Sequence, residues 1–117
     1  MTTFGSFIRQ HRETKRTEDR RYSVRQVATR VGVEPSYLSK VERDQVAPPS
    51  EETIKRLAAD LDLDADLLLA MAGKVSSDLM DVIRKRPLMF AALIRELQSL
   101  PDHAVLTLVR EVHDGDW

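Results

Sequence analysis

The stretch SVRQVATRVGVEPSYLSKVER, residues 23–43, decides the fold. In its first part the apolar residues recur three or four positions apart, which predicts a short amphipathic helix. Ser23 offers a hydroxyl acceptor at the start of that helix, and Gln26 three residues later completes a capping-box pattern. The expected buried stripe consists of Val24, Val27, Ala28 and Val31.

A second short helix is expected almost at once. Gly32 suits a helix stop because glycine takes a positive φ at little cost, and Pro35 suits a first helical turn, where no N–H is needed. We expect this helix over residues 35–43, with Leu38 and Val41 facing inward. Two short helices joined by a glycine-containing turn form a helix-turn-helix, whose second helix fits the major groove of B-DNA.

Helical periodicity continues on both sides of this stretch and predicts an all-α fold. Upstream, we expect a helix from Phe4 to Thr14 and then an exposed charged loop over residues 15–21. Downstream, prolines keep residues 47–49 extended. Capping residues, glycines and prolines then delimit a helix opened by Ser50 and helices over residues 65–72, 78–86, 87–98 and 101–112.

A set of spaced residues is more specific than this geometry: Ala28, Gly32, Val33, Tyr37, Leu38, Ser39, Val41, Glu42, Arg43, Pro49 and Ser50. With these residues the chain resembles the phage-repressor-like (XRE, Cro/CI-type) helix-turn-helix transcription factors over about residues 4–73. The resemblance implies a five-helix repressor-like DNA-binding domain, residues 1–73, and leaves a C-terminal segment of two or three helices, residues 74–117. The sequence departs from the family pattern at Val24, where Gln is frequent, and at Asp44, where Gly is common.

The resemblance also implies a structural ion pair. Arg12, near the end of the first helix, is expected to reach Glu42 at the end of the third helix in a largely buried contact that fixes the recognition helix. The alternative is that both are surface residues that never meet.

DNA contacts are expected on the outer side of the helix over residues 35–43, at positions that the family uses. Ser36 and Lys40 lie one turn apart, and we expect them to read bases, because lysine donates to guanine O6 or N7 and serine contacts several bases. Arg25 and Arg43 are expected to contact phosphates, which carry no sequence information. The full set is Arg25, Pro35, Ser36, Tyr37, Ser39, Lys40 and Arg43, and the alternative for each is a solvated helix face.

The charged segment after the first helix is longer than the common form of the family. It carries Lys15, Arg16, Arg20 and Arg21, which suggests an added clamp on the DNA backbone. The alternative is an irregular solvated loop that its own Glu18 and Asp19 neutralise.

The net charge of −1 conceals two unlike parts. Residues 1–48 contain 10 basic and 6 acidic side chains, whereas residues 49–117 contain 8 basic and 13 acidic ones, so the first part is the one expected to meet a polyanion. The chain has no cysteine and its three histidines share no ligand spacing, so we predict no metal site and no cofactor. No apolar run approaches the ~18 residues of a membrane span, and the N-terminus resembles no export signal, which favours a cytoplasmic protein.

Residues 74–117 contain more apolar side chains than so short a segment can bury alone. We expect a symmetric homodimer, because one helix-turn-helix reads few base pairs whereas a two-fold pair reads half-sites ~34 Å apart. The alternatives are packing onto the fourth and fifth helices, or contact with a regulatory protein partner or a protease.

These features predict a sequence-specific double-stranded-DNA-binding transcriptional regulator, a repressor that binds an inverted-repeat operator as a homodimer. An enzyme has no support, since the sequence lacks a phosphate-binding glycine loop, a catalytic triad pattern and a metal signature. The alternative function is an antitoxin-like or adaptor protein whose C-terminal helices bind a protein partner and whose DNA binding is autoregulatory.

Overall fold

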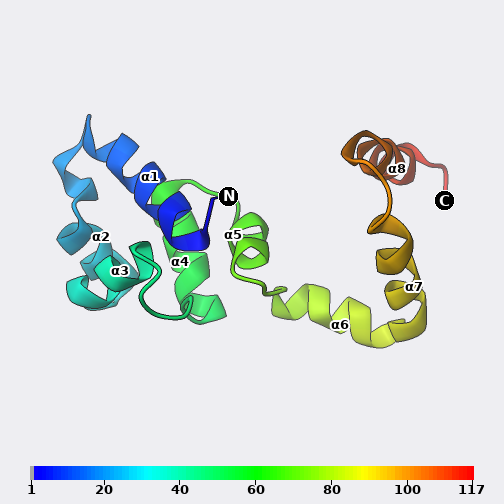
Figure 1. The fold of residues 1–117 in the computed structure, drawn as a ribbon, viewed down its shortest axis with the longest axis horizontal. Helices are drawn as coiled ribbons and strands as arrows, with labels where there is room; N and C mark the ends of the chain where they lie inside the picture. Colours follow the sequence, from blue (N-terminus) through cyan, green and yellow to red (C-terminus); the bar gives the residue numbers. More distant parts are fainter. Residues whose placement is uncertain (1) are drawn as a thin grey trace. The chain divides into compact units, whose positions relative to one another are not determined.

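The computed structural model describes residues 2–117, which form two compact units, residues 2–76 and 77–117. The described residues are all-helical, without a strand, as predicted (Figure 1). The first unit contains α1 (Phe4–Arg16), the 3₁₀ helix η1 (Arg20–Tyr22), α2 (Val24–Val31), α3 (Pro35–Glu42), α4 (Glu51–Leu61) and α5 (Ala65–Met71). The second contains α6 (Ser77–Lys85), α7 (Pro87–Leu97) and α8 (Asp102–Asp114).

The first unit buries its apolar stripes in two neighbouring clusters. One lies where α1, α3, α4 and α5 meet, and Ile8, Ile54 and Leu68 at its centre are fully buried. The other joins α2, α3 and α4 around Val27 and Leu57. Since α3 contributes to both clusters, its inner side is fixed from two directions and its outer side is left for solvent.

The turn between α2 and α3 has the predicted geometry. Gly32 takes a left-handed conformation with φ 86°, and the N–H groups of Gly32 and Val33 donate to the Ala28 carbonyl at 2.8 and 2.9 Å. Ala28 itself is fully buried, so a larger side chain would separate the two helices. At the start of α2, Ser23 Oγ accepts the Gln26 N–H at 3.3 Å, which is one of the two bonds of the expected capping box.

The predicted exposed loop over residues 15–21 is wrong at both ends. The helix α1 continues through Arg16, and η1 begins at Arg20. Lys15 is held in the last turn of α1 by an ion pair with Asp62 at 3.0 Å. The side chain of Asp19 accepts the Arg21 N–H at 2.9 Å and thereby caps η1. Local sequence gives no sign of Asp62, which follows α4, and this is why the predicted helix is too short.

Other helix ends differ from the prediction by one or two residues. The last helical residue of α3 is Glu42, and Asp44 just beyond it takes a left-handed φ of 57°. Ser77 belongs to α6 instead of preceding it, and Pro101 lies before α8 instead of inside it.

The second unit has no buried core of its own. Among its described residues, none of α6, α7 or α8 is buried, although all three helices carry apolar side chains. Leu88 and Met89 are 85% and 69% exposed. Within residues 2–117, no helix has both the length and the apolarity that crossing a membrane requires.

Candidate nucleic-acid interface

A buried ion pair joins α1 to the end of α3. Arg12 Nε and Nη2 donate to Glu42 Oε2 and Oε1 at 2.7 and 2.8 Å, a two-pronged contact, and both residues are at most 5% exposed. Arg12 Nη1 also donates to the Tyr22 carbonyl at 3.1 Å. The hydrogen bond to Glu42 raises the pKa of Arg12 against the opposing effect of burial. One guanidinium therefore ties α1, η1 and α3 together, and the end of α3 has little freedom to move.

The outer side of α3 carries the two predicted base readers. Ser36 and Lys40 are both exposed, four residues apart on one helical face, while Leu38 and Val41 are buried on the other. Lysine and serine on such a face provide donors that a base edge in the major groove can accept.

Three of the predicted contact residues are half-buried. Pro35 begins α3, Tyr37 packs against the first core cluster, and Ser39 accepts a hydrogen bond at its carbonyl from Arg43 Nε at 3.3 Å. Tyr37 thus has a packing role in addition to the predicted DNA contact. Arg43 is exposed at the end of the helix.

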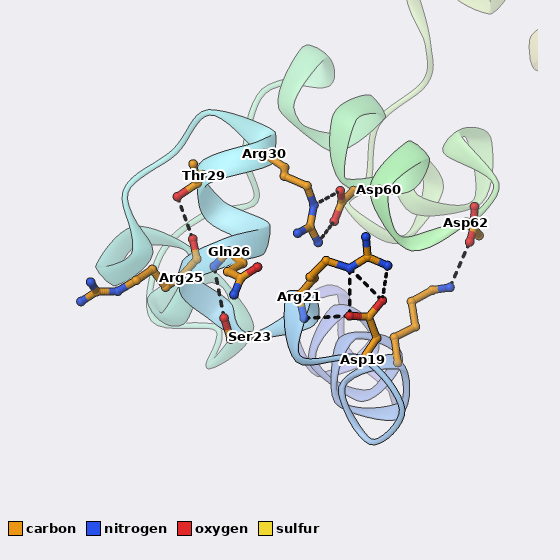
Figure 2. A network of polar contacts seen from close by, with 10 residues as sticks. Asp19, Arg21, Ser23, Arg25, Gln26, Thr29, Arg30, Asp60 and Asp62 are labelled. Atoms are coloured by element: carbon orange, nitrogen blue, oxygen red, sulfur yellow. Dashed lines mark hydrogen bonds and ion pairs between the residues drawn. The ribbon is translucent and has the colours of Figure 1, made fainter.

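Part of the basic segment is already neutralised within the fold (Figure 2). Arg21 is paired with Asp19, with Nη2 and Oδ2 at 2.8 Å, and these bonds lower the pKa of Asp19 to about 2. Lys15 is paired with Asp62 on the loop after α4, and the hydrogen bond raises the pKa of Lys15. Lys15 and Arg21 are therefore each paired with a carboxylate of the chain. The sequence alone did not distinguish them from Arg16 and Arg20 as candidates for a DNA-backbone contact.

A second internal pair lies beside them. Arg30 on α2 donates to Asp60 on α4 through Nε and Nη2, at 2.6 and 3.0 Å, and this raises the pKa of Arg30. The Tyr22 ring lies 5.0 Å from the Arg30 guanidinium carbon and 5.4 Å from Lys15 Nζ. Arg25, on the same helix, points away from this network (Figure 2).

The exposed cations of the first unit fall into two groups, those paired with a carboxylate of the chain and those without such a partner. Those that lack a carboxylate partner within the described residues are Arg9, Arg16, Arg20, Arg25, Lys40 and Arg43. Cations without a carboxylate partner have no nearby negative charge to offset their field, so they can attract an external anion more strongly.

Sequence reasoning missed two residues of this region. Arg9 was not singled out, although its spacing of seven from Arg16 puts both on one face of α1. Asp44 was considered only as a cap, yet its carboxylate accepts from Thr3 Oγ1 at 2.6 Å and from the Gly5 N–H at 3.2 Å. The spacing of Arg9 from Arg16 was readable in the sequence, whereas the contacts of Asp44 with Thr3 and Gly5 were not.

Comparison with known proteins identifies a family model and several relatives that match part of the chain. A family model described as a helix-turn-helix domain matches residues 3–71. An uncharacterized HTH-type transcriptional regulator of Mycobacterium tuberculosis is 42% identical over 69 residues, 59% of this chain and 45% of that protein. The uncharacterized HTH-type transcriptional regulator RghRB of Bacillus subtilis is 35% identical over 77 residues, 66% of this chain and 52% of that protein.

A solved chain from a SinR protein/SinI protein complex is 26% identical with a TM-score of 0.49, and the match covers 84% of this chain and 100% of that one. The matches span about half the length of the curated relatives. The family model covers more than half of the 117 residues, on the unit that contains α2, the Gly32 turn and α3. The chain therefore belongs to the helix-turn-helix domain family.

Proposed function

We propose that this chain is a sequence-specific double-stranded-DNA-binding transcriptional regulator that represses by occupying an inverted-repeat operator as a homodimer. The observation that carries the proposal is the exposed face of α3, with Ser36 and Lys40, held in place by the buried Arg12–Glu42 pair. A rigidly mounted helix with outward donors meets the requirement of base readout in the major groove.

The two units take different roles in this proposal. Residues 1–73 contact DNA, with Ser36 and Lys40 on base edges. The second unit, within residues 74–117, dimerises. The positioning contacts come from Arg25, Pro35, Tyr37, Ser39 and Arg43.

The lack of a core in α6–α8 supports the homodimer. An isolated segment of about 40 residues rarely buries enough apolar surface to be stable by itself. Two apolar hollows of about 360 and 420 Å³ lie in this unit, and Leu93 borders both. A second copy of the same helices would cover this surface and give the two-fold arrangement that an inverted repeat requires.

The same exposed apolar side chains favour a second candidate function. In an antitoxin-like or adaptor protein, the helices α6–α8 would bind a different protein, and DNA binding would be autoregulatory. A stoichiometric partner that co-purifies with the chain and keeps it from self-associating would support this candidate over the homodimer.

Selection of bound sequences from random duplex DNA tests the main proposal. We expect enrichment of an inverted repeat whose half-site centres lie about 10 base pairs apart, one helical turn. No enrichment at ~0.1 M salt would contradict sequence-specific binding.

The selected duplex then tests the roles of individual residues. We expect Lys40→Ala to cost about 1–3 kcal/mol and to relax the preference at one position of each half-site. Arg43→Ala should weaken binding to all sequences alike, since a phosphate contact carries no sequence information. Lys55→Ala on α4, which removes an exposed lysine paired with Glu51, is the matched control and should change neither property.

A further inference from the structure

A cleft of about 230 Å³ lies between α1, α2 and α3 of the first unit. Arg9 and Arg16 line it from α1, Arg43 from the end of α3 and Val24 from the start of α2. It therefore borders Arg43, which the proposed function assigns to the DNA backbone, and it extends that surface onto a helix outside the helix-turn-helix.

The acidic groups at this cleft are already occupied. Glu42 receives two hydrogen bonds from Arg12, at 2.7 and 2.8 Å, and Glu13 receives one from the same guanidinium at 3.0 Å. The residues that line the cleft include four arginines and two glutamates, so its formal charge is +2. Arg9 and Arg16 have no carboxylate partner within the described part of the chain.

The donors fit one chemical class of ligand. Arginine guanidinium groups present planar pairs of N–H donors that match the oxygens of a phosphate. Arg9 and Arg16 are two helical turns apart, about 10 Å along the axis of α1, so they flank a group that enters between them. The Val24 side chain, which lines the cleft from α2, has no hydrogen-bond donor, so the arginines of α1 and Arg43 supply the cationic donors of the cleft.

We propose that this cleft binds a backbone phosphodiester of duplex DNA through Arg9 and Arg16, an inference that rests on the proposed function. The backbone clamp then consists of Arg9 and Arg16 on α1, whereas Lys15 and Arg21 of the basic segment are held by Asp62 and Asp19. Arg9 and Arg16 act as positioning contacts that fix the register of α3 on the duplex without reading sequence.

The salt dependence of duplex binding tests this proposal. Binding of the full chain is measured from 50 to 200 mM salt on two probes, a duplex obtained by selection from random DNA and a scrambled duplex of equal length. In the homodimer each substitution removes its contact from both half-sites. We therefore expect Arg9→Gln and Arg16→Gln each to reduce the slope of log K against log salt by about 1.8, at about 0.9 for each lost phosphate contact. Both probes should lose affinity by the same factor.

Two further sets of variants separate a specific contact from net charge. Lys55→Gln also removes one exposed positive charge and should leave the slope unchanged. Arg9→Lys and Arg16→Lys keep the charge and are expected to keep most of the slope while losing affinity, because lysine lacks the planar pair of donors. Arg9→Gln and Arg16→Gln slopes equal to that of Lys55→Gln would overturn the proposal.

The failure of this inference is distinguishable from failure of the proposed function. If the unmodified chain binds no duplex at any salt concentration, the proposed function is wrong. If it binds, and Lys40→Ala and Arg43→Ala weaken it while Arg9→Gln and Arg16→Gln do not, only the cleft is wrong.

Discussion

The buried Arg12–Glu42 pair joins α1 to the end of α3. A buried salt bridge adds little net free energy to the fold, because the cost of removing two charges from water offsets their attraction. Its value here is geometric, since a two-pronged contact with a buried guanidinium allows one orientation of the end of α3.

Replacing Glu42 tests this role. Glu42→Ala would leave the Arg12 charge buried without its main partner, and we expect a loss of about 3–5 kcal/mol in the free energy of unfolding, measured by urea denaturation. Glu52→Ala removes an exposed carboxylate paired with Arg56 and should cost about 0–1 kcal/mol. A Glu42→Ala midpoint equal to that of Glu52→Ala would contradict a structural role for the pair.

The Asp19 carboxylate gives a pH-dependent readout of the basic segment. Its pKa of about 2 lies below the ordinary value because Arg21 donates side-chain and backbone hydrogen bonds to it. A carboxyl pKa that is lower in the folded state stabilises the fold above about pH 4, and this contribution fades as the pH falls towards 2. We expect an NMR titration of Asp19 with a midpoint near 2.

Substitution of the neighbouring arginines identifies the cause of that shift. Arg21→Gln should return the Asp19 midpoint towards the ordinary value, whereas Arg20→Gln, which removes an adjacent charge, should leave it where it is. An unchanged midpoint in Arg21→Gln would mean that the pair does not form in solution.

Among the helices, the approach of α1 to the end of α3 is the contact that the periodic pattern did not foresee. Gly5 is buried there, and a Cβ atom at this position would overlap the Val41 carbonyl oxygen and the Asp44 carboxylate. Asp44 in turn accepts the Gly5 N–H, so the start of α1 is held by a residue 39 positions away.

Gly5→Ala is therefore expected to force the two helices apart. We expect it to lower the free energy of unfolding by about 1–3 kcal/mol, even though alanine is the better helix former. Gln10→Ala, at an exposed position of the same helix, should be neutral or slightly stabilising. A thermal melting temperature of Gly5→Ala at or above that of the unmodified chain would contradict the close approach.

Most α-helix boundaries of the first unit were predicted to within one residue because local signals mark them, whereas η1 was not predicted. Gly32 with its positive φ, and the capping residues Ser23, Ser50 and Asp64, mark these boundaries in the sequence itself. The end of α1 was not predictable, because Lys15 is held there by Asp62, a partner 47 residues further along the chain.

At the scale of the whole molecule, the two units differ in how much of their apolar surface is buried. The first has two core clusters, whereas the described residues of α6–α8 include none that is buried. Covering the apolar side chains of the second unit would provide the main driving force for self-association, at roughly 25 cal/mol per Å² of apolar surface removed from water.

Leu93 is the position at which to test this assembly. It borders both apolar hollows of the second unit and is 49% exposed. We expect the unmodified chain to sediment as a dimer at micromolar concentration and Leu93→Glu to sediment as a monomer, because a charge buried at the interface has no partner. Ser99→Glu, at an exposed position between α7 and α8, is the control that should stay dimeric. A monomeric unmodified chain would contradict the homodimer.

The sequence by itself determined the all-α class, the helix-turn-helix over residues 23–43 and the family, because periodicity, caps and the Gly32 turn are local properties of the chain. Only the tertiary structure decided which cations are left for an anion. Lys15 and Arg30 meet Asp62 and Asp60 because α4 packs beside them, and no local pattern encodes such distant partners. The tertiary structure likewise brought Arg9 to the same cleft as Arg43, because α1 crosses the end of α3 at Gly5.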